Sequence, residues 1–196
     1  GSDTYSLLFK ALQNYKIEDK VFINIIQIFD ENIQTIEKMD DHNYKLCYQK
    51  QIRMVSDKEL VYLLSSGTTK GILLYTLMVA SLKNGFDLIV DEIENHFNKE
   101  IVTTLLRFFM DSKLNRNGGT LIFSTHYPEL LDEYERNDGI FITRNRNGIT
   151  VENLSNILKR NDIKKSDAYQ SGFLEGTTPT YEAYMQLKKS IAAYLA

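Results

Sequence analysis

Two carboxylates and one imidazole follow two short apolar runs of the sequence. Asp91 and Glu92 come directly after FDLIV (86–90), and His126 comes directly after TLIFST (120–125). If these runs are neighbouring parallel strands, their carboxyl ends open on the same sheet edge, where α/β folds place ligands. A carboxylate there can hold Mg²⁺ through its waters, a second can orient or deprotonate a water, and a histidine can hydrogen-bond a γ-phosphate. These residue types favour nucleotide hydrolysis, with a solvated acidic loop as the alternative.

A small polar loop, LLSSGTTKG (63–71), runs directly into the apolar stretch ILLYTLMVASL. A helix that starts in this loop would offer unpaired N–H groups and a positive dipole end, which is a kind of anion site. Ser65, Ser66 and Thr68 add hydroxyl donors, and Gly67 allows close backbone approach. The alternative is an ordinary serine N-cap on a core helix.

A degenerate phosphate-binding P-loop is a second interpretation of the same loop, with LVYLL (60–64) as its strand. The G-x-x-x-x-G-K-[ST] motif is absent from the chain, and Lys70 is followed by Gly71 rather than by serine or threonine. The hydroxyl that binds Mg²⁺ in that motif is therefore missing.

Further metal-ligating side chains lie near Asp91 and Glu92 in the sequence. Glu94 and His96 extend the acidic stretch, so a metal-dependent nuclease is a rival enzyme class. No second acidic constellation is seen elsewhere in the sequence, which argues against it.

The pattern of apolar residues predicts the elements that position these side chains. Steps of three and four from Phe22 to Met39 predict one helix face over 17–39. The remaining expected elements are two short strands in KLCYQKQI and ELVYLL, a buried helix over 66–83, a βαβ unit made of 86–90, 98–113 and 120–125, a hairpin in GIFITRNRNGITVENL, and a C-terminal helix in YEAYMQLKKSIAAYL.

Composition bounds the class of protein. The 196 residues carry a net charge of −3 and are 43% hydrophobic and 25% charged, which is typical of a globular domain and not of a dedicated nucleic-acid binder. Cys47 is the only cysteine, so no internal disulfide forms, which fits a cytoplasmic location. The longest apolar run, 72–82, is too short to span a bilayer.

Three stretches, in this order, resemble one family. LSSGT (64–68) resembles the signature loop of ABC-type ATPases, LIVDEIENHFN (88–98) resembles a Walker B strand followed by a D-loop, and LIFSTHYPELLD (121–132) resembles the switch-histidine strand and the helix after it. The set is similar to the C-terminal part of an ABC-type ATPase head. It is most similar to the AAA-annotated ATP-binding proteins of bacterial abortive-infection and phage-defence systems.

The resemblance implies a role for each matching residue, with ATP and Mg²⁺ as cofactors. Asp91 would support Mg²⁺, Glu92 would be the catalytic base, and His126 would be the switch histidine. The signature residues would contact the γ-phosphate of ATP held by a second head; they are Ser65, Ser66, Gly67 and Thr68. Asn95 and Asn98 would lie in the D-loop, where Asn98 replaces the acid or histidine that the family usually carries.

One departure from the family pattern dominates. The sequence has no Walker A motif, which the family carries in an N-terminal lobe upstream of these motifs. The Gly1-Ser2 start is typical of a cloning scar, so residues 3–196 are expected to be the C-terminal lobe of a P-loop ATPase head whose N-terminal lobe is missing.

The expected fold is α/β, a partial ABC-ATPase head with a mostly parallel sheet, flanking helices and a C-terminal hairpin. The resemblance implies ATP binding and hydrolysis in a dimerising head, with a second head, the missing lobe and an effector protein as partners and no membrane. A nucleic-acid partner is not indicated. The alternative is a non-catalytic dimerisation or regulatory module of a split or inactive ATPase.

Overall fold

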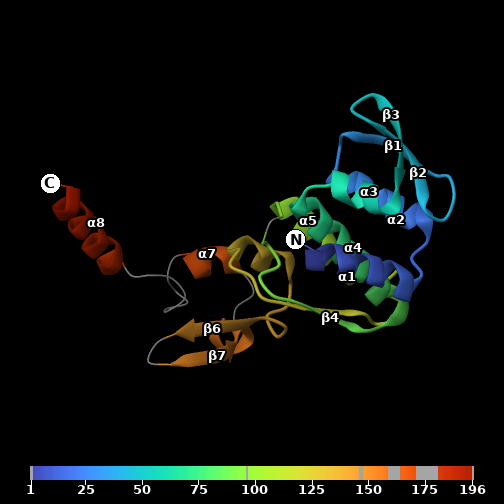
Figure 1. Ribbon diagram of the computed structural model, residues 1–196. Helices are drawn as coiled ribbons and strands as arrows, with labels where there is room; N and C mark the ends of the chain where they lie inside the picture. The colour runs from blue at the N-terminus through green and yellow to red at the C-terminus, as the bar shows by residue number, and fades with distance from the viewer. Residues whose placement is uncertain (1, 96, 146–147, 159–163, 171–180, 196) are drawn as a thin grey trace. The chain divides into compact units, whose positions relative to one another are not determined.

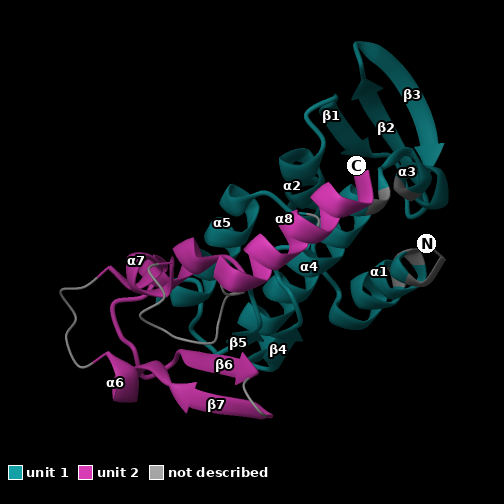
Figure 2. Ribbon diagram, turned by 90° about the vertical axis from the view of Figure 1, so that its left-hand side faces the viewer, with its two compact units in different colours: residues 1–125 teal, residues 126–196 magenta. Residues whose placement is uncertain are grey.

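The protein divides into two compact units. The computed structural model describes residues 2–95, 97–145, 148–158, 164–170 and 181–195. Unit 1 covers Gly1–Thr125 and unit 2 covers His126–Ala196, and the two units are coloured separately in Figure 2. Each unit is described by itself.

Unit 1 contains the helices and strands that precede and include the predicted βαβ segment (Figure 1). Its elements are α1 (Ser2–Tyr15), α2 (Asp19–Phe29), β1 (Ile33–Lys38), β2 (Asn43–Tyr48), β3 (Gln51–Ser56), α3 (Asp57–Leu63), α4 (Ser66–Asn84), β4 (Asp87–Val90), α5 (Lys99–Met110) and β5 (Thr120–Phe123).

Helix α4 is the centre of unit 1, as its nearly all-apolar sequence predicts. It packs against α1, α2, α5 and β4. Tyr75 on α4 is 1% exposed; its ring meets Phe29 edge-on at 5.2 Å between centroids and Phe108 at 6.5 Å. The Tyr75 hydroxyl donates to the Ile101 carbonyl at 2.7 Å, and burial raises its pKa to about 12. This hydroxyl therefore stays neutral and links α4 to α5.

The prediction of one helix over 17–39 is wrong in its second half. Helix α2 ends at Phe29, and Asp30 is extended, with its carboxylate accepting from the Asn32 N–H at 2.9 Å. The chain turns there and continues as β1, which pairs antiparallel with β2. A side-chain–backbone bond of this kind competes with helix propagation, and the apolar spacing at Ile33 and Ile36 does not distinguish the two outcomes.

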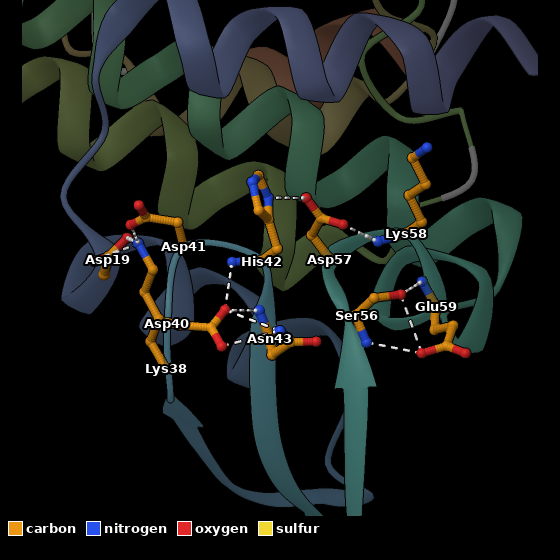
Figure 3. Close-up of polar contacts among 10 residues, drawn as sticks. All are labelled: Asp19, Lys38, Asp40, Asp41, His42, Asn43, Ser56, Asp57, Lys58 and Glu59. Carbon is orange, nitrogen blue, oxygen red and sulfur yellow. Dashed lines mark hydrogen bonds and ion pairs between the residues drawn. The ribbon is translucent and has the colours of Figure 1, made fainter.

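The prediction of a strand in ELVYLL is also wrong, because this segment is helix α3. Ser56 and Glu59 form a reciprocal capping box: the Ser56 N–H donates to the Glu59 carboxylate at 2.8 Å, and the Glu59 N–H donates to the Ser56 hydroxyl at 3.2 Å (Figure 3). The backbone bond from Ser56 lowers the pKa of Glu59. The segment KLCYQKQI spans β2, a turn at Gln49 and Lys50 with positive φ at both residues, and the start of β3.

Asp40 holds the turn between β1 and β2. Its carboxylate accepts from the His42 and Asn43 N–H groups, each at 2.9 Å (Figure 3). His42 is exposed at this turn, and its ring nitrogen Nδ1 lies 3.4 Å from the Asp57 carboxylate.

The predicted βαβ unit is present. Strands β4 and β5 pair in parallel, with Leu88 opposite Leu121 and Val90 opposite Phe123, and α5 lies between them in the chain. The apolar sequences of the two runs favour strands that are buried on both faces, but one face is open, since Ile89 is 74% exposed and its partner Ile122 is 50% exposed. Within the described residues, this sheet has only two strands.

Unit 2 is built around the predicted hairpin. Its elements are the 3₁₀ helix η1 (Pro128–Glu133), β6 (Phe141–Asn145), β7 (Ile149–Asn153), α6 (Leu154–Ile157), α7 (Lys165–Gln170) and α8 (Tyr181–Leu195). Its core is formed by Ile142, Leu154, Leu158 and Ala168. The Asp132 carboxylate accepts from the Ser166 N–H at 3.1 Å and from the Ser166 hydroxyl, which joins η1 to α7. The predicted C-terminal helix is α8, none of whose residues is buried.

The fold is thus mixed α/β, with three small sheets among the described residues. A mostly parallel sheet is not confirmed: only β4 and β5 pair in parallel there, while β1–β2–β3 and β6–β7 are antiparallel. No helix in the described ranges is long and apolar enough to cross a membrane.

Candidate functional site

The carboxyl ends of β4 and β5 bring Asp91 and Ser124 together. Because Val90 pairs with Phe123, the next residue of each strand exits at the same level of the sheet. The Ser124 hydroxyl donates to the Asp91 carboxylate and accepts from the Glu92 N–H at 2.7 Å. The predicted acidic pair therefore lies at a sheet edge, held by the neighbouring strand.

The Ser124 backbone completes this link. Its N–H donates to the Val90 carbonyl at 3.1 Å, and its carbonyl accepts from the Ile93 N–H at 3.0 Å. Ser124 is thus bonded to four consecutive residues, from Val90 at the end of β4 to Ile93.

Glu92 has an unusual backbone conformation. Its φ is +46°, in the left-handed region that non-glycine residues rarely adopt and that is associated with functional sites. The Asn95 side-chain amide donates to the Glu92 carboxylate, and the Asn95 N–H donates to the Glu92 carbonyl at 2.9 Å. The Glu92 side chain is exposed, so its carboxylate is both oriented by Asn95 and accessible to solvent.

Asn98, the second predicted D-loop residue, is the N-cap of α5. Its side-chain oxygen accepts from the Ile101 N–H at 3.0 Å. This bond explains why α5 begins at Lys99. It gives Asn98 a structural role as an N-cap, which was not predicted from the sequence.

The metal-cluster interpretation gains no support from the described part of the chain. There, no group of three or more His, Cys, Asp or Glu side chains is placed to hold a metal ion. Glu94 is 8% exposed, and His96 lies outside the described residues.

The loop at 64–68 leads into α4 as the sequence predicts. Ser65 is the N-cap of α4: its hydroxyl oxygen accepts from the Thr68 N–H at 3.1 Å and lies 2.8 Å from the Thr68 hydroxyl. The serine N-cap and the anion-site interpretation therefore describe the same helix start. The degenerate P-loop is wrong, because helix α3, not a strand, precedes the loop.

Gly67 lies in the first turn of α4 with space around it. A Cβ added there would meet nothing closer than the Ser65 hydroxyl oxygen at 4.0 Å. The packing of this chain therefore does not require a glycine at this position. The Ser66 side chain lies outside the described part of the structure.

A cleft of about 470 Å³ lies beside this loop. Ser65 and Thr68 are among the residues that line it, together with Asp30, Glu31 and Tyr48. The loop is therefore accessible from outside unit 1.

His126 is the first residue of unit 2 and is exposed. It follows β5 closely, as predicted. Because the units are described separately, its placement relative to Asp91 and Glu92 stays a prediction.

The comparison with protein families agrees with the location of these motifs. A family model described as "AAA domain, putative AbiEii toxin, Type IV TA system" matches residues 18–132, which is more than half of the chain. The chain belongs to this family. It is an AAA-type, P-loop ATPase-like domain. Domains of this class have a nucleotide-dependent, ATPase-like activity that uses ATP and Mg²⁺. The matched region of this AAA domain contains the three motif stretches and ends at Asp132. No curated protein matches the sequence.

Ser124 is the residue of the AAA domain that the sequence analysis missed. It stands two positions before His126 in TLIFSTH and was treated only as part of a strand. The sequence carried no signal for it: aligned from their first residues, FDLIV and TLIFST place Ser124 opposite Val90, whereas the observed register pairs Val90 with Phe123 and so brings Ser124 beside Asp91.

Proposed function

We propose that this AAA domain is the signature, Walker B and switch-histidine part of a dimerising ABC-type ATPase. The observation that carries the proposal is the fixed acidic pair, Asp91 and Glu92, at the carboxyl end of β4. There, Ser124 bonds to both residues and Asn95 orients the second carboxylate.

Glu92 is the proposed catalytic base. Its carboxylate accepts one bond from Asn95, and a carboxylate has lone pairs for several hydrogen bonds, so it can also orient and deprotonate an attacking water. His126 is proposed to hydrogen-bond the γ-phosphate.

Asp91 is the residue of this chain proposed to hold Mg²⁺. One carboxylate is sufficient, because protein Mg²⁺ sites commonly combine one or two carboxylates with substrate phosphates and water. The ion, when bound, offsets negative charge on the phosphate oxygens. The bond from Ser124 fixes the Asp91 carboxylate while leaving acceptor capacity for the ion or its waters.

The signature residues Ser65, Ser66, Gly67 and Thr68 are proposed to contact the γ-phosphate of ATP held by a second head. Ser65 and Thr68 share one hydroxyl–hydroxyl bond, so one O–H of the pair remains to donate outward. The open space at Gly67 and the positive end of the α4 dipole favour an anion at this loop.

The Walker A motif that would bind the ATP phosphates is proposed to lie in an N-terminal lobe. The exposed apolar face at Ile89 and Ile122 supports this, because a two-stranded sheet with one open face is marginal by itself. The family description, which names a toxin of a toxin–antitoxin system, supports a role in abortive infection or anti-phage defence. ATP turnover there would switch the conformation that controls an effector protein.

Glu92→Gln in the full-length protein tests the proposal. The amide keeps the shape of the side chain but cannot accept a proton, so turnover is expected to stop and the ATP-bound dimer to accumulate. Steady-state phosphate release and size-exclusion chromatography with ATP and Mg²⁺ measure the two effects.

Glu100→Gln is the matched control. Glu100 is an exposed carboxylate in the first turn of α5, so the same change of charge there should leave turnover intact. Unchanged ATPase activity in Glu92→Gln would contradict the assignment of the base. An inactive wild-type protein that still dimerises would instead favour a regulatory module.

A further inference from the structure

We infer that Ser124 is a positioning residue that sets Asp91 and Glu92 in their working geometry. This inference rests on the proposed function for the roles of the two acids. Its basis is one oxygen atom, the Ser124 hydroxyl, which bonds to the side chain of the first acid and to the backbone of the second.

A hydroxyl suits this position because the two bonds run in opposite directions. The Ser124 O–H donates to the Asp91 carboxylate, while a lone pair on the same oxygen accepts from the Glu92 N–H at 2.7 Å. Alanine supplies neither bond. Threonine supplies both and is compatible with the end of a strand.

The bond to the Glu92 N–H stabilises a strained conformation. Glu92 has a φ of +46°, and such a residue persists only where surrounding contacts fix it. Ser124 holds its backbone N–H, and Asn95 holds its carboxylate. Without the hydroxyl, Asn95 still bonds to the Glu92 carboxylate, but the backbone at Glu92 can relax. The carboxylate of the proposed base is then no longer held in a fixed orientation.

The bond to Asp91 restricts the other acid. Outer-shell hydrogen bonds that orient a metal-binding carboxylate commonly change activity or metal affinity by about 10- to 100-fold when they are removed. The Ser124 backbone bonds to Val90 and Ile93 do not depend on its side chain, so the strand pairing survives the substitution. A loss of activity in Ser124→Ala would therefore not require unfolding.

The test compares Ser124→Ala with Ser124→Thr in the full-length protein. Ser124→Ala is expected to lower kcat about 10- to 100-fold with the KM for ATP within about threefold, and to raise the Mg²⁺ concentration needed for half-maximal rate. Ser124→Thr is expected to restore kcat to within about threefold of wild type. Ser190→Ala is the control, because among the described residues its hydroxyl bonds within α8, at 3.0 Å to the Gln186 carbonyl.

Amide hydrogen exchange of this chain supplies a readout that needs no turnover. The Glu92 N–H is expected to be protected in the wild type and in Ser124→Thr, and to exchange faster in Ser124→Ala. Protection that is unchanged in Ser124→Ala would overturn the inference, whether or not the protein hydrolyses ATP.

The kinetic outcomes separate the two proposals. If Glu92→Gln stays active, the proposed function fails, and the exchange of the Glu92 amide alone decides the role of Ser124. If Glu92→Gln is inactive and Ser124→Ala loses less than tenfold in kcat, only the positioning role fails. Equal losses in Ser124→Ala and Ser124→Thr, together with a lowered thermal midpoint, would show a structural role and overturn it as well.

Discussion

Gly67 and Gly71 lie four positions apart on α4 and lack a side chain for different reasons. A Cβ at Gly71 would lie 2.2 Å from the Phe29 ring, so this glycine allows α2 to pack on α4. A Cβ at Gly67 would enter open space near the cleft. The packing of this chain therefore does not require the first glycine, whereas it does require the second.

Substitution of these two glycines by alanine separates function from stability. Gly67→Ala is expected to raise the unfolding free energy by about 0.5–1 kcal/mol, because alanine favours the helix, while lowering ATPase turnover of the full-length protein. Gly71→Ala is expected to lower the unfolding free energy by about 1–3 kcal/mol through overpacking. Urea denaturation and steady-state turnover measure the two effects. Full turnover in Gly67→Ala would show that no phosphate approaches this backbone.

At the scale of elements, the N-caps of the helices determine where the site residues lie. Ser65 caps α4, Asn98 caps α5, and Ser56 with Glu59 caps α3. The Ser56 cap joins β3 directly to α3, whereas Ser65 and Asn98 stand where a loop leads into a helix and fix the end of that loop. The strained Glu92 turn is held between β4 and the cap of α5.

The role of Asn98 can be tested at this scale. Asn98→Ala is expected to lower the unfolding free energy by about 1 kcal/mol, because the Ile101 N–H loses its acceptor. Asn98→Asp should keep both stability and turnover, since aspartate is an equally good N-cap. Urea denaturation and ATPase rates check this, and a stable but inactive Asn98→Asp would assign Asn98 a role in communication between heads.

At the scale of the whole molecule, the chain carries the acids proposed to act on Mg²⁺ and water, but its sequence has no Walker A lysine loop. We expect this chain alone to bind ATP weakly or not at all, because the contacts to the nucleotide's phosphates come mostly from that loop. Isothermal titration calorimetry with ATP, with and without Mg²⁺, measures this. Micromolar, Mg²⁺-dependent binding would mean that the chain holds a nucleotide site of its own.

Several features of the fold follow from sequence alone, because they depend on local patterns. The apolar stretch after Gly67 becomes the central helix, FDLIV and TLIFST become a parallel pair through α5, and the segment around Asn145 becomes a hairpin. The second half of the helix expected across 17–39 and the strand expected in ELVYLL are wrong for a common reason. Apolar spacing does not reveal an Asp30 side-chain bond or a Ser56–Glu59 capping box unless the turn chemistry is also considered.

The sequence determined which residues could do chemistry and that Asp91 and Glu92 follow a strand, since residue type and local order can be read from it. Only the tertiary structure decided that Ser124 on β5 bonds to both, that Glu92 sits at a positive φ, and that Ile89 and Ile122 are exposed. These facts depend on the register between strands and on which faces are covered. Register and coverage arise from contacts between segments far apart in the chain, so local sequence patterns do not specify them.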